Sequence, residues 1–258
     1  MFFKQTFRLQ SGWYRSGLCK LELKHKEIID FCIANTDDSI IKKYSRYFKE
    51  GYNGYGIDSK IFESQKNTWL ASWKDEMTIN DYLNLGDLLI ATGKFEEASF
   101  ATQFIASKKD EFSIETFDRV GKWLENGIQN WANTDVLCML VLPEFIYSKV
   151  IEPKGFINWT KSESKWKRRA VPVTFYEVIK KGHNPESILS EIETLMEDKE
   201  EDVQKGLGTL LREIWKKQPE IAEGFLLKWK DRCGRKIIHY ATEKMDKENK
   251  AKFQKTKK

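Results

Sequence analysis

The sequence predicts an all-α protein built as a solenoid, or superhelix, of antiparallel helix pairs. Only five of its 258 residues are proline, and no stretch alternates apolar with polar residues over the length of a strand. Apolar residues recur at helical spacing instead, and short polar turns separate the helical segments. Amphipathic helix pairs that bury their apolar stripes against neighbouring pairs build α-solenoids. No repeated sequence is evident, so spacing alone favours a solenoid over a compact bundle.

Helical periodicity identifies the strongest elements. Apolar residues recur at helical spacing in five segments, which are 95–105, 117–124, 188–196, 203–214 and 221–229. Asn184 or Ser187 is the candidate N-cap of the helix at 188–196. Two lysines and Pro219 mark the end of the helix at 203–214. We therefore expect short helices in close succession along most of the chain.

Three parts are expected along the chain. Residues 1–40 have no clear period beyond an apolar cluster at 28–33, and they are predicted to form an N-terminal helical extension. Residues 41–243 hold the helical signals and form the predicted repeat domain. Residues 244–258 are predicted to form a charged C-terminal tail.

Composition argues against several classes of protein. The longest apolar run, 136–143, is far shorter than the roughly 20 residues of a membrane-spanning helix, and the N-terminus lacks the apolar stretch of a signal peptide. Four scattered cysteines and three histidines favour neither a disulfide scaffold nor a metal site. We expect a cytoplasmic protein that needs no metal or cofactor.

Positive charge is concentrated in the C-terminal part. Residues 161–258 carry 24 Lys and Arg against 17 Asp and Glu, whereas residues 1–160 carry 20 against 22. A positive surface attracts polyanions, because neutralised phosphates release their condensed counterions. Positive charge also serves solubility, so charge alone leaves both interpretations open.

The segment 130–135, which enters the apolar run, is the first candidate site. If a helix already runs through Trp131, the i, i+4 spacing puts its indole and the Asp135 carboxylate on one face. The two side chains would then be near enough to share a substrate. The alternative is that Asp135 or Thr134 caps a buried helix and that Trp131 packs in the core.

Two further clusters contain aromatic residues. The segment 159–170 places two tryptophans seven residues apart among basic side chains, a mixture that suits a phosphate backbone. A solvated helix face beside core tryptophans explains it equally well. The segment 47–57 has three glycines among three tyrosines, without the spacing of a nucleotide-binding loop. Its structural interpretation is an ordinary loop with packed tyrosines.

Taken in order, these segments resemble the AlkD-type DNA alkylation-repair glycosylases. The matching segments are 46–49 with Gly56-Ile57, Asn130-Trp131 with Asp135, then Trp159, Ser162 and 166–170, and finally 205–213. The resemblance spans about residues 40 to 240. It implies a superhelix of HEAT-like repeats whose concave, basic face binds duplex DNA. It also implies hydrolysis of the N-glycosidic bond of cationic N3- or N7-alkylated purines.

The resemblance also assigns site residues. Asp135 matches the catalytic carboxylate, and Trp131 matches an indole beside the sugar of the damaged nucleotide. The expected DNA-binding residues are Tyr47, Trp166, Arg168, Arg169, Lys205, Thr209 and Arg212. A cationic purine is already a good leaving group, so cleavage mainly requires stabilisation of the developing oxocarbenium sugar by a carboxylate. We expect a monomer that binds double-stranded DNA carrying alkylated bases and does not bind membranes.

One residue departs from the family pattern. The family has a second tryptophan where this chain has Thr209, and Trp215, six residues further on, lies on a different helical face. A wider cleft for another lesion is one consequence of this change. A protein of the same fold that binds DNA without excising a base is another. A scaffold for a protein partner remains a third alternative, since fold does not fix function.

Overall fold

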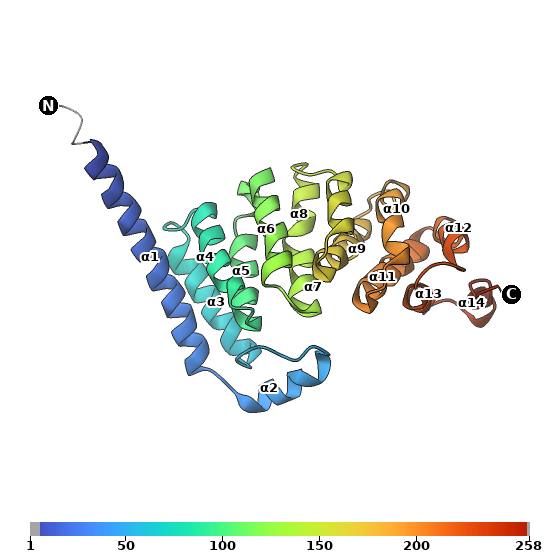
Figure 1. Cartoon of the computed structure of the whole chain (residues 1–258), viewed down its shortest axis with the longest axis horizontal. Helices are drawn as coiled ribbons and strands as arrows, with labels where there is room; N and C mark the ends of the chain where they lie inside the picture. The colour runs from blue at the N-terminus through green and yellow to red at the C-terminus, as the bar shows by residue number, and fades with distance from the viewer. Residues whose placement is uncertain (1–5, 257–258) are drawn as a thin grey trace. The chain divides into compact units, whose positions relative to one another are not determined.

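The computed structural model describes residues 6–256, and it describes side chains from Lys20 onward. Within this part of the chain there are 14 α-helices and no strand, so the predicted all-α class is confirmed (Figure 1). The helices form two compact units, Met1–Lys108 and Lys109–Lys258. The boundaries expected from the sequence, after residues 40 and 243, stay predictions, and the extreme ends of the expected extension and tail lie outside the described residues.

The first unit is built around an aromatic core. Its elements are α1 (Thr6–Ala34), α2 (Asp38–Tyr44), the 3₁₀ helix η1 (Ser45–Tyr47), α3 (Ser59–Trp73), α4 (Ile79–Ala91) and α5 (Phe95–Ala106). Trp69 and Trp73 stack with ring centroids 5.4 Å apart, and Phe104 of α5 packs against both rings. A capping box between Thr78 and Asp81 begins α4. The core therefore joins α3 to the α4–α5 pair.

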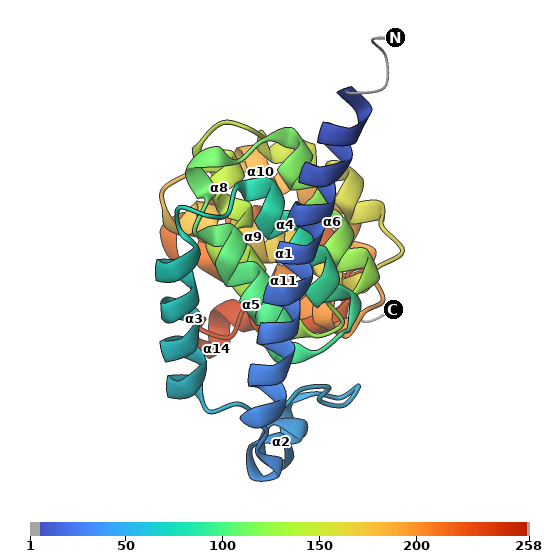
Figure 2. The ribbon, with the colours of Figure 1, turned by 90° about the vertical axis from the view of Figure 1, so that its left-hand side faces the viewer.

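Helix α1 is longer than its sequence pattern indicated. From residue 20 onward, its buried positions form a narrow stripe of Lys24, Ile28 and Cys32 at i, i+4 and i+8. Helix α1 packs against α4 and α5, beside which it lies in Figure 1 and Figure 2. The Lys24 ammonium lies 4.2 Å from the ring centroid of Trp73, so a charged residue occupies a buried position. Because one of the three buried positions is a lysine, the apolar residues of α1 recur too weakly at helical spacing to indicate the full helix.

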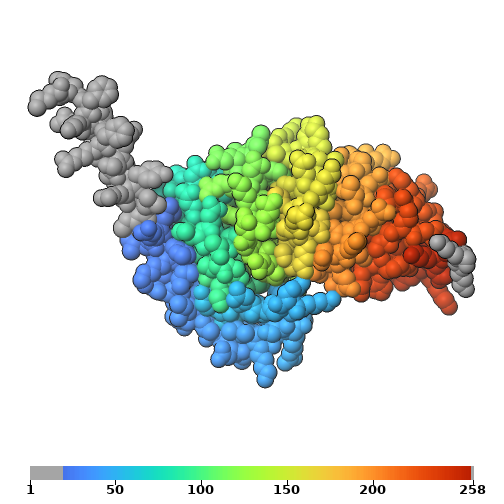
Figure 3. Space-filling model, in the orientation of Figure 1, coloured from blue at the N-terminus to red at the C-terminus, as the bar shows by residue number. Residues whose placement is uncertain are grey.

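The second unit is a succession of helices in chain order, visible as consecutive bands of colour in Figure 3. Its elements are η2 (Lys109–Glu111), α6 (Ile114–Asn126), α7 (Trp131–Leu140), α8 (Leu142–Tyr147), η3 (Pro153–Lys161), α9 (Lys165–Lys180), α10 (Glu186–Ile192), η4 (Glu193–Glu197), α11 (Glu201–Lys217), α12 (Pro219–Trp229), α13 (Arg235–Ala241) and α14 (Lys247–Ala251). The predicted stripes at 203–214 and 221–229 are α11 and α12.

Four of these helices, α7, α9, α11 and α13, pack side by side. Asp135 of α7 pairs with Arg169 of α9, and further along both helices Cys138 bonds the carbonyl of Ala170. The two helices therefore run parallel. We call these four helices the helix row. A Cβ atom on Gly208 of α11 would lie 2.6 Å from the Tyr240 Cβ of α13, so glycine permits this close packing.

Two sequence expectations about helix ends are corrected. Helix α10 begins at Glu186, so Ser187 lies inside it, and Asn184 accepts a hydrogen bond from the Glu186 N–H without capping the helix as its N-cap residue. The expected helix at 188–196 also changes at Glu193 to the 3₁₀ helix η4. In the predicted tail, α14 is followed by the fully buried Phe253, which anchors this segment.

Two kinds of feature are absent from the described residues. No group of three or more His, Cys, Asp or Glu side chains is placed to hold a metal ion. None of the described helices combines the length and apolarity that crossing a membrane requires.

Candidate functional site

Helix α7 begins at Trp131, as the functional interpretation of this segment required. The N-cap is Asn130, whose side-chain oxygen accepts the N–H of Asn133 at 2.8 Å. The hydroxyl of Thr134 donates to the Asn130 carbonyl within the helix. The alternative in which Asp135 or Thr134 caps the helix is therefore wrong, and Asp135 lies one full turn inside it.

The solvent-facing side of α7 carries Trp131 and Asp135 together. The indole is 38% exposed, and the side chain of Asp135 is 25% exposed. The other exposed or half-buried residues of this helix are Ala132, Val136, Met139 and Leu140. This face is therefore apolar around a single carboxylate. The i, i+4 spacing predicted that Trp131 and Asp135 share a face, but the apolar residues around them, such as Met139 at i+8, were not predicted.

Arg169 of α9 holds the Asp135 carboxylate with two hydrogen bonds. Its Nε donates to Oδ1 at 2.9 Å, and its Nη2 donates to Oδ2 at 2.8 Å. The remaining terminal nitrogen, Nη1, donates to the backbone carbonyl of Asp202 in α11. Arg169 is 8% exposed, so most of its surface is used inside the helix row. A contact between Arg169 and the DNA backbone stays a prediction. The N–H groups of Arg169 that bond neither Asp135 nor Asp202 would have to make it.

The surroundings of Asp135 act on its charge in opposite directions. Burial raises the pKa of the Asp135 carboxyl above its ordinary value, and the nearby Asp202 charge adds to this effect. The hydrogen bonds and charge of Arg169 partly offset it. Arg169 donates one hydrogen bond to each carboxylate oxygen, and each oxygen has a further acceptor position. The carboxylate is thus fixed in orientation and can still accept a hydrogen bond from water.

Asp202 connects the next two helices of the row. Its carboxylate lies 3.6 Å from the Lys165 ammonium of α9 and 3.4 Å from the Lys205 ammonium of α11. Both lysines are about a quarter exposed. Asp202 was not among the site residues expected from the sequence. The i, i+3 spacing of Asp202 and Lys205 was a usable signal, but the contact with Lys165 required the fold.

Three expected DNA-binding residues make contacts inside the second unit. The Trp166 side chain is buried, with 6% of its surface exposed. Arg168 donates to Asp198 through Nε at 2.6 Å, and Arg212 pairs with Glu243 of the segment that follows α13. Their contacts with DNA stay predictions. For Trp166, burial leaves little surface with which to make one.

The other expected residues lie on α11 and in the first unit. Lys205 and Thr209 are half-buried and one turn apart on α11. Beside them, a Cβ atom on Gly206 would lie 3.2 Å from Cγ2 of Val173 in α9, so glycine permits close packing of α11 against α9. Tyr47 lies in η1 of the first unit and is 63% exposed.

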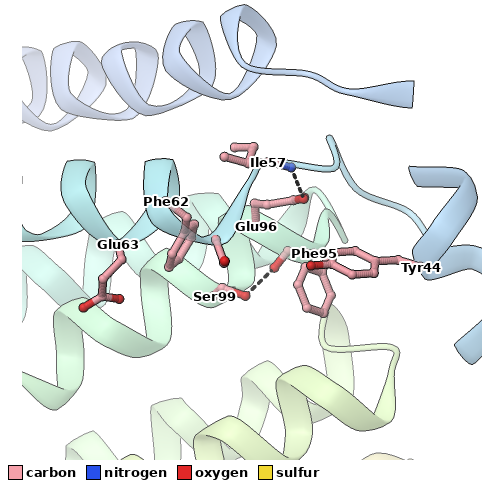
Figure 4. Close-up of a pocket in the computed structure, with 8 residues that line it drawn as sticks. Tyr44, Ile57, Phe62, Glu63, Phe95, Glu96 and Ser99 are labelled. Atoms are coloured by element: carbon pink, nitrogen blue, oxygen red, sulfur yellow. Dashed lines mark hydrogen bonds between the residues drawn. The ribbon is translucent and has the colours of Figure 1, made fainter. Parts of the chain in front are cut away.

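The glycine-rich segment 47–57 is held by one buried carboxylate. Glu96 accepts the hydroxyl of Tyr52 at 2.6 Å and the N–H groups of Tyr55, Gly56 and Ile57 at 2.8, 2.8 and 3.2 Å. Figure 4 shows the bond between Ile57 and Glu96. The segment is therefore a fixed connection with packed tyrosines, as its structural interpretation predicted.

A cavity of about 220 Å³ lies beside this connection in the first unit (Figure 4). Its wall includes the rings of Tyr44, Phe62 and Phe95. Glu63, at its edge, is paired with Lys66 at 2.5 Å, and the Glu96 carboxylate is used by the loop. None of the expected site residues lines this cavity.

Known proteins are similar to this chain over most of the helices described above. The family described as "DNA alkylation repair enzyme" matches residues 32–245. Among solved structures, AlkD2 from Streptococcus mutans is 21% identical, with a TM-score of 0.55 over 80% of this chain and 97% of AlkD2. The protein smu.31 from Streptococcus mutans UA159 is 22% identical, with a TM-score of 0.55 over 71% of this chain and 92% of that one. No curated protein matches the chain.

Proposed function

The chain belongs to the family of DNA alkylation repair enzymes, and from this membership we propose that it excises cationic N3- or N7-alkylated purines from duplex DNA. The observation that carries the proposal is the Asp135 carboxylate, oriented by Arg169 on a solvent-facing surface one turn from Trp131. The catalytic roles of Asp135 and Trp131 are part of this proposal. The reaction is hydrolysis of the N-glycosidic bond.

The proposed reaction needs little acid catalysis. As the bond between C1′ of the sugar and the purine nitrogen breaks, its electron pair neutralises the alkylated base, which leaves uncharged. The sugar develops positive charge, and the Asp135 carboxylate stabilises that charge electrostatically. A water molecule that donates a hydrogen bond to Asp135 then attacks C1′ and passes its proton to the Asp135 carboxylate, which releases it to solvent. The acceptor position left on each carboxylate oxygen suits this role.

Trp131 supplies an aromatic surface beside the carboxylate. The face of an indole attracts positive charge, an effect of about 1 to 2 kcal/mol when water is excluded. The apolar residues around Asp135 on α7 would exclude water once a duplex covers them, which strengthens the electrostatic interactions there. Trp131 and the rest of this face thus support stabilisation of a cationic transition state.

Thr209 favours a second candidate function, which is DNA binding without excision. Its short side chain on α11 cannot provide the aromatic surface that the family pattern places there. In that case the protein would bind damaged or distorted duplex through its cationic side chains and release no base from any lesion. Base release by the wild-type protein separates the two functions directly.

The experiment is a base-release assay on duplex DNA containing N7-methylguanine. We expect the wild-type protein to release the base and Asp135→Asn to release it about a hundredfold more slowly or not at all. The matched control is Asp198→Asn, which makes the same substitution in the neighbouring pair with Arg168. This control should retain activity if it remains folded by thermal melting. Equal rates for wild type and Asp135→Asn would end the catalytic assignment.

A further inference from the structure

Two lysines from neighbouring helices converge on one oxyanion at the edge of the helix row. The ammonium groups of Lys165 and Lys205 lie 3.6 and 3.4 Å from different oxygens of the Asp202 carboxylate. The Asp202 side chain is 16% exposed, and those of the two lysines are 24% and 25% exposed. The three charged groups are therefore within reach of a ligand that approaches this surface.

The fold fixes Asp202 at this position. Its backbone carbonyl accepts a hydrogen bond from Arg169, and its side chain lies in the first turn of α11, where the helix dipole favours a negative charge. Glu201, the preceding residue, lies 4.0 Å from both Lys205 and Lys236. Lys165 and Lys205 are thus already oriented toward an anion in the protein without ligand.

We propose that Lys165 and Lys205 form a phosphodiester-binding site, and that the Asp202 carboxylate occupies the anion position between them in the free protein. A carboxylate and a phosphodiester are both oxyanions that accept hydrogen bonds from ammonium groups. A DNA phosphate that enters this site must compete with Asp202 for the same two cations, and the two anions repel each other. Asp202 therefore organises the site and lowers its affinity for DNA.

This inference rests on the DNA binding in the proposed function but goes beyond it. Binding to undamaged duplex depends mainly on phosphate contacts, which carry no sequence information. A carboxylate that weakens one such contact shortens the time spent on undamaged DNA. Removing that carboxylate is therefore expected to tighten binding, the opposite of what loss of a simple structural contact predicts.

The test measures binding of a short, undamaged, fluorescently labelled duplex over a series of salt concentrations. Asp202→Asn keeps the backbone carbonyl that accepts from Arg169 and removes only the side-chain charge. We expect it to bind roughly threefold to tenfold more tightly than wild type at low salt, as one unit charge a few ångströms from a phosphate implies. Its affinity should also fall more steeply with salt, because a stronger phosphate contact releases more counterion.

Two controls keep the result specific to this site. Glu223→Gln in α12 removes an equivalent carboxylate, which lies 3.5 Å from Lys252, and it should change the affinity less than Asp202→Asn does. Replacing Lys165 and Lys205 together by glutamine in the Asp202→Asn protein should abolish the gain. Thermal melting checks that each variant is folded.

The titrations test the phosphate site separately from the proposed excision of bases. A folded Asp202→Asn variant that binds duplex no more tightly than wild type overturns the inference, and so does a gain that survives loss of both lysines. If wild type binds duplex but releases no alkylated base, the excision proposal fails and the phosphate site is still decided by the same titrations. If wild type shows no salt-dependent duplex binding, both proposals fail.

Discussion

The guanidinium of Arg169 and the carboxylate of Asp135 form a two-point hydrogen-bonded pair, with distances of 2.9 and 2.8 Å, between adjacent helices α9 and α7. Because both groups are planar, two parallel hydrogen bonds fix the carboxylate in rotation as well as in position. A buried pair contributes little net stability, but removing one partner leaves the other charge unpaired and costs about 3 to 5 kcal/mol. The pair therefore positions Asp135 more than it stabilises the fold.

Replacing Arg169 by lysine tests this positioning role. Lysine keeps the positive charge but donates from a single atom, so it cannot hold both oxygens in the same plane. We predict that Arg169→Lys lowers the single-turnover rate of base release about tenfold while destabilising the protein less than Arg169→Ala does. The rate and the melting temperature are measured for both variants. A wild-type rate in a folded Arg169→Lys protein would contradict the prediction.

In the proposed reaction, the pH dependence of base release depends on the charge of Asp135. The carboxylate must be ionised to stabilise a cation, and burial raises its pKa above the ordinary value. Activity should therefore fall as the pH is lowered through this raised pKa. Because the Asp202 charge also raises it, Asp202→Asn should move this acid limb to lower pH. The rate of base release is measured against pH for the wild-type protein and for Asp202→Asn. A shift of the acid limb to higher pH in the variant would refute the prediction.

Gly208 is predicted to be essential for packing between α11 and α13. A Cβ atom there would lie 2.6 Å from the Tyr240 Cβ and 2.7 Å from the Ile237 carbonyl oxygen, which belongs to the backbone. Gly208→Ala should therefore lower the free energy of unfolding by about 1 to 3 kcal/mol. The control is Gly224→Ala in α12, where no atom lies within 4 Å of the new methyl group. It should raise the free energy of unfolding by roughly 0.5 to 1 kcal/mol, because alanine favours the helix.

Chemical denaturation distinguishes these two glycine variants. The prediction fails if Gly208→Ala unfolds at the same denaturant concentration as wild type. It also fails if both substitutions destabilise the protein equally, since space around the new methyl group would then not be the cause.

Glu96 is predicted to hold the connection at 52–57 in place. Glutamine has one acceptor oxygen instead of two and places an N–H₂ group against backbone donors. Glu96→Gln should destabilise the first unit by about 2 kcal/mol and increase amide hydrogen exchange at 55–57. Glu63→Gln, at the same cavity but mostly exposed, should change neither. Unchanged exchange in Glu96→Gln would show that its hydrogen bonds do not fix this segment.

Features that depend on residues close together in the sequence could be predicted, whereas contacts between residues far apart in the sequence could not. The stripe at 203–214 became α11 because helical spacing is local. The ordered motifs indicated a DNA alkylation repair family, which the family match confirms, and the solved structures share the fold. By contrast, the pairing of Arg169 with Asp135 joins residues 34 apart in the chain, and no local pattern specifies it. For Arg169, the resemblance predicted a contact with the DNA backbone, and its pairing with Asp135 was not predicted.

Burial explains the other differences from expectation. Two interpretations of 159–170 were left open, and the buried Trp166 fits the one with core tryptophans, while Arg168 pairs with Asp198. Residues 1–40 were predicted to be helical, but the buried stripe of α1 was not identified, because it contains Lys24. In both cases the composition of a segment did not reveal which side of its helix faces the neighbours.

The two glycines of α11 have a consequence for how this protein can diverge. Gly206 faces α9 and Gly208 faces α13, so both sides of α11 are in fixed register with their neighbours. Inserting a single residue ahead of these glycines would rotate everything before it by about 100° relative to them. Asp202 and Lys205 would then turn away from Lys165 and Arg169. Over evolutionary time, α11 can therefore vary by exchanging side chains, while its length stays constrained.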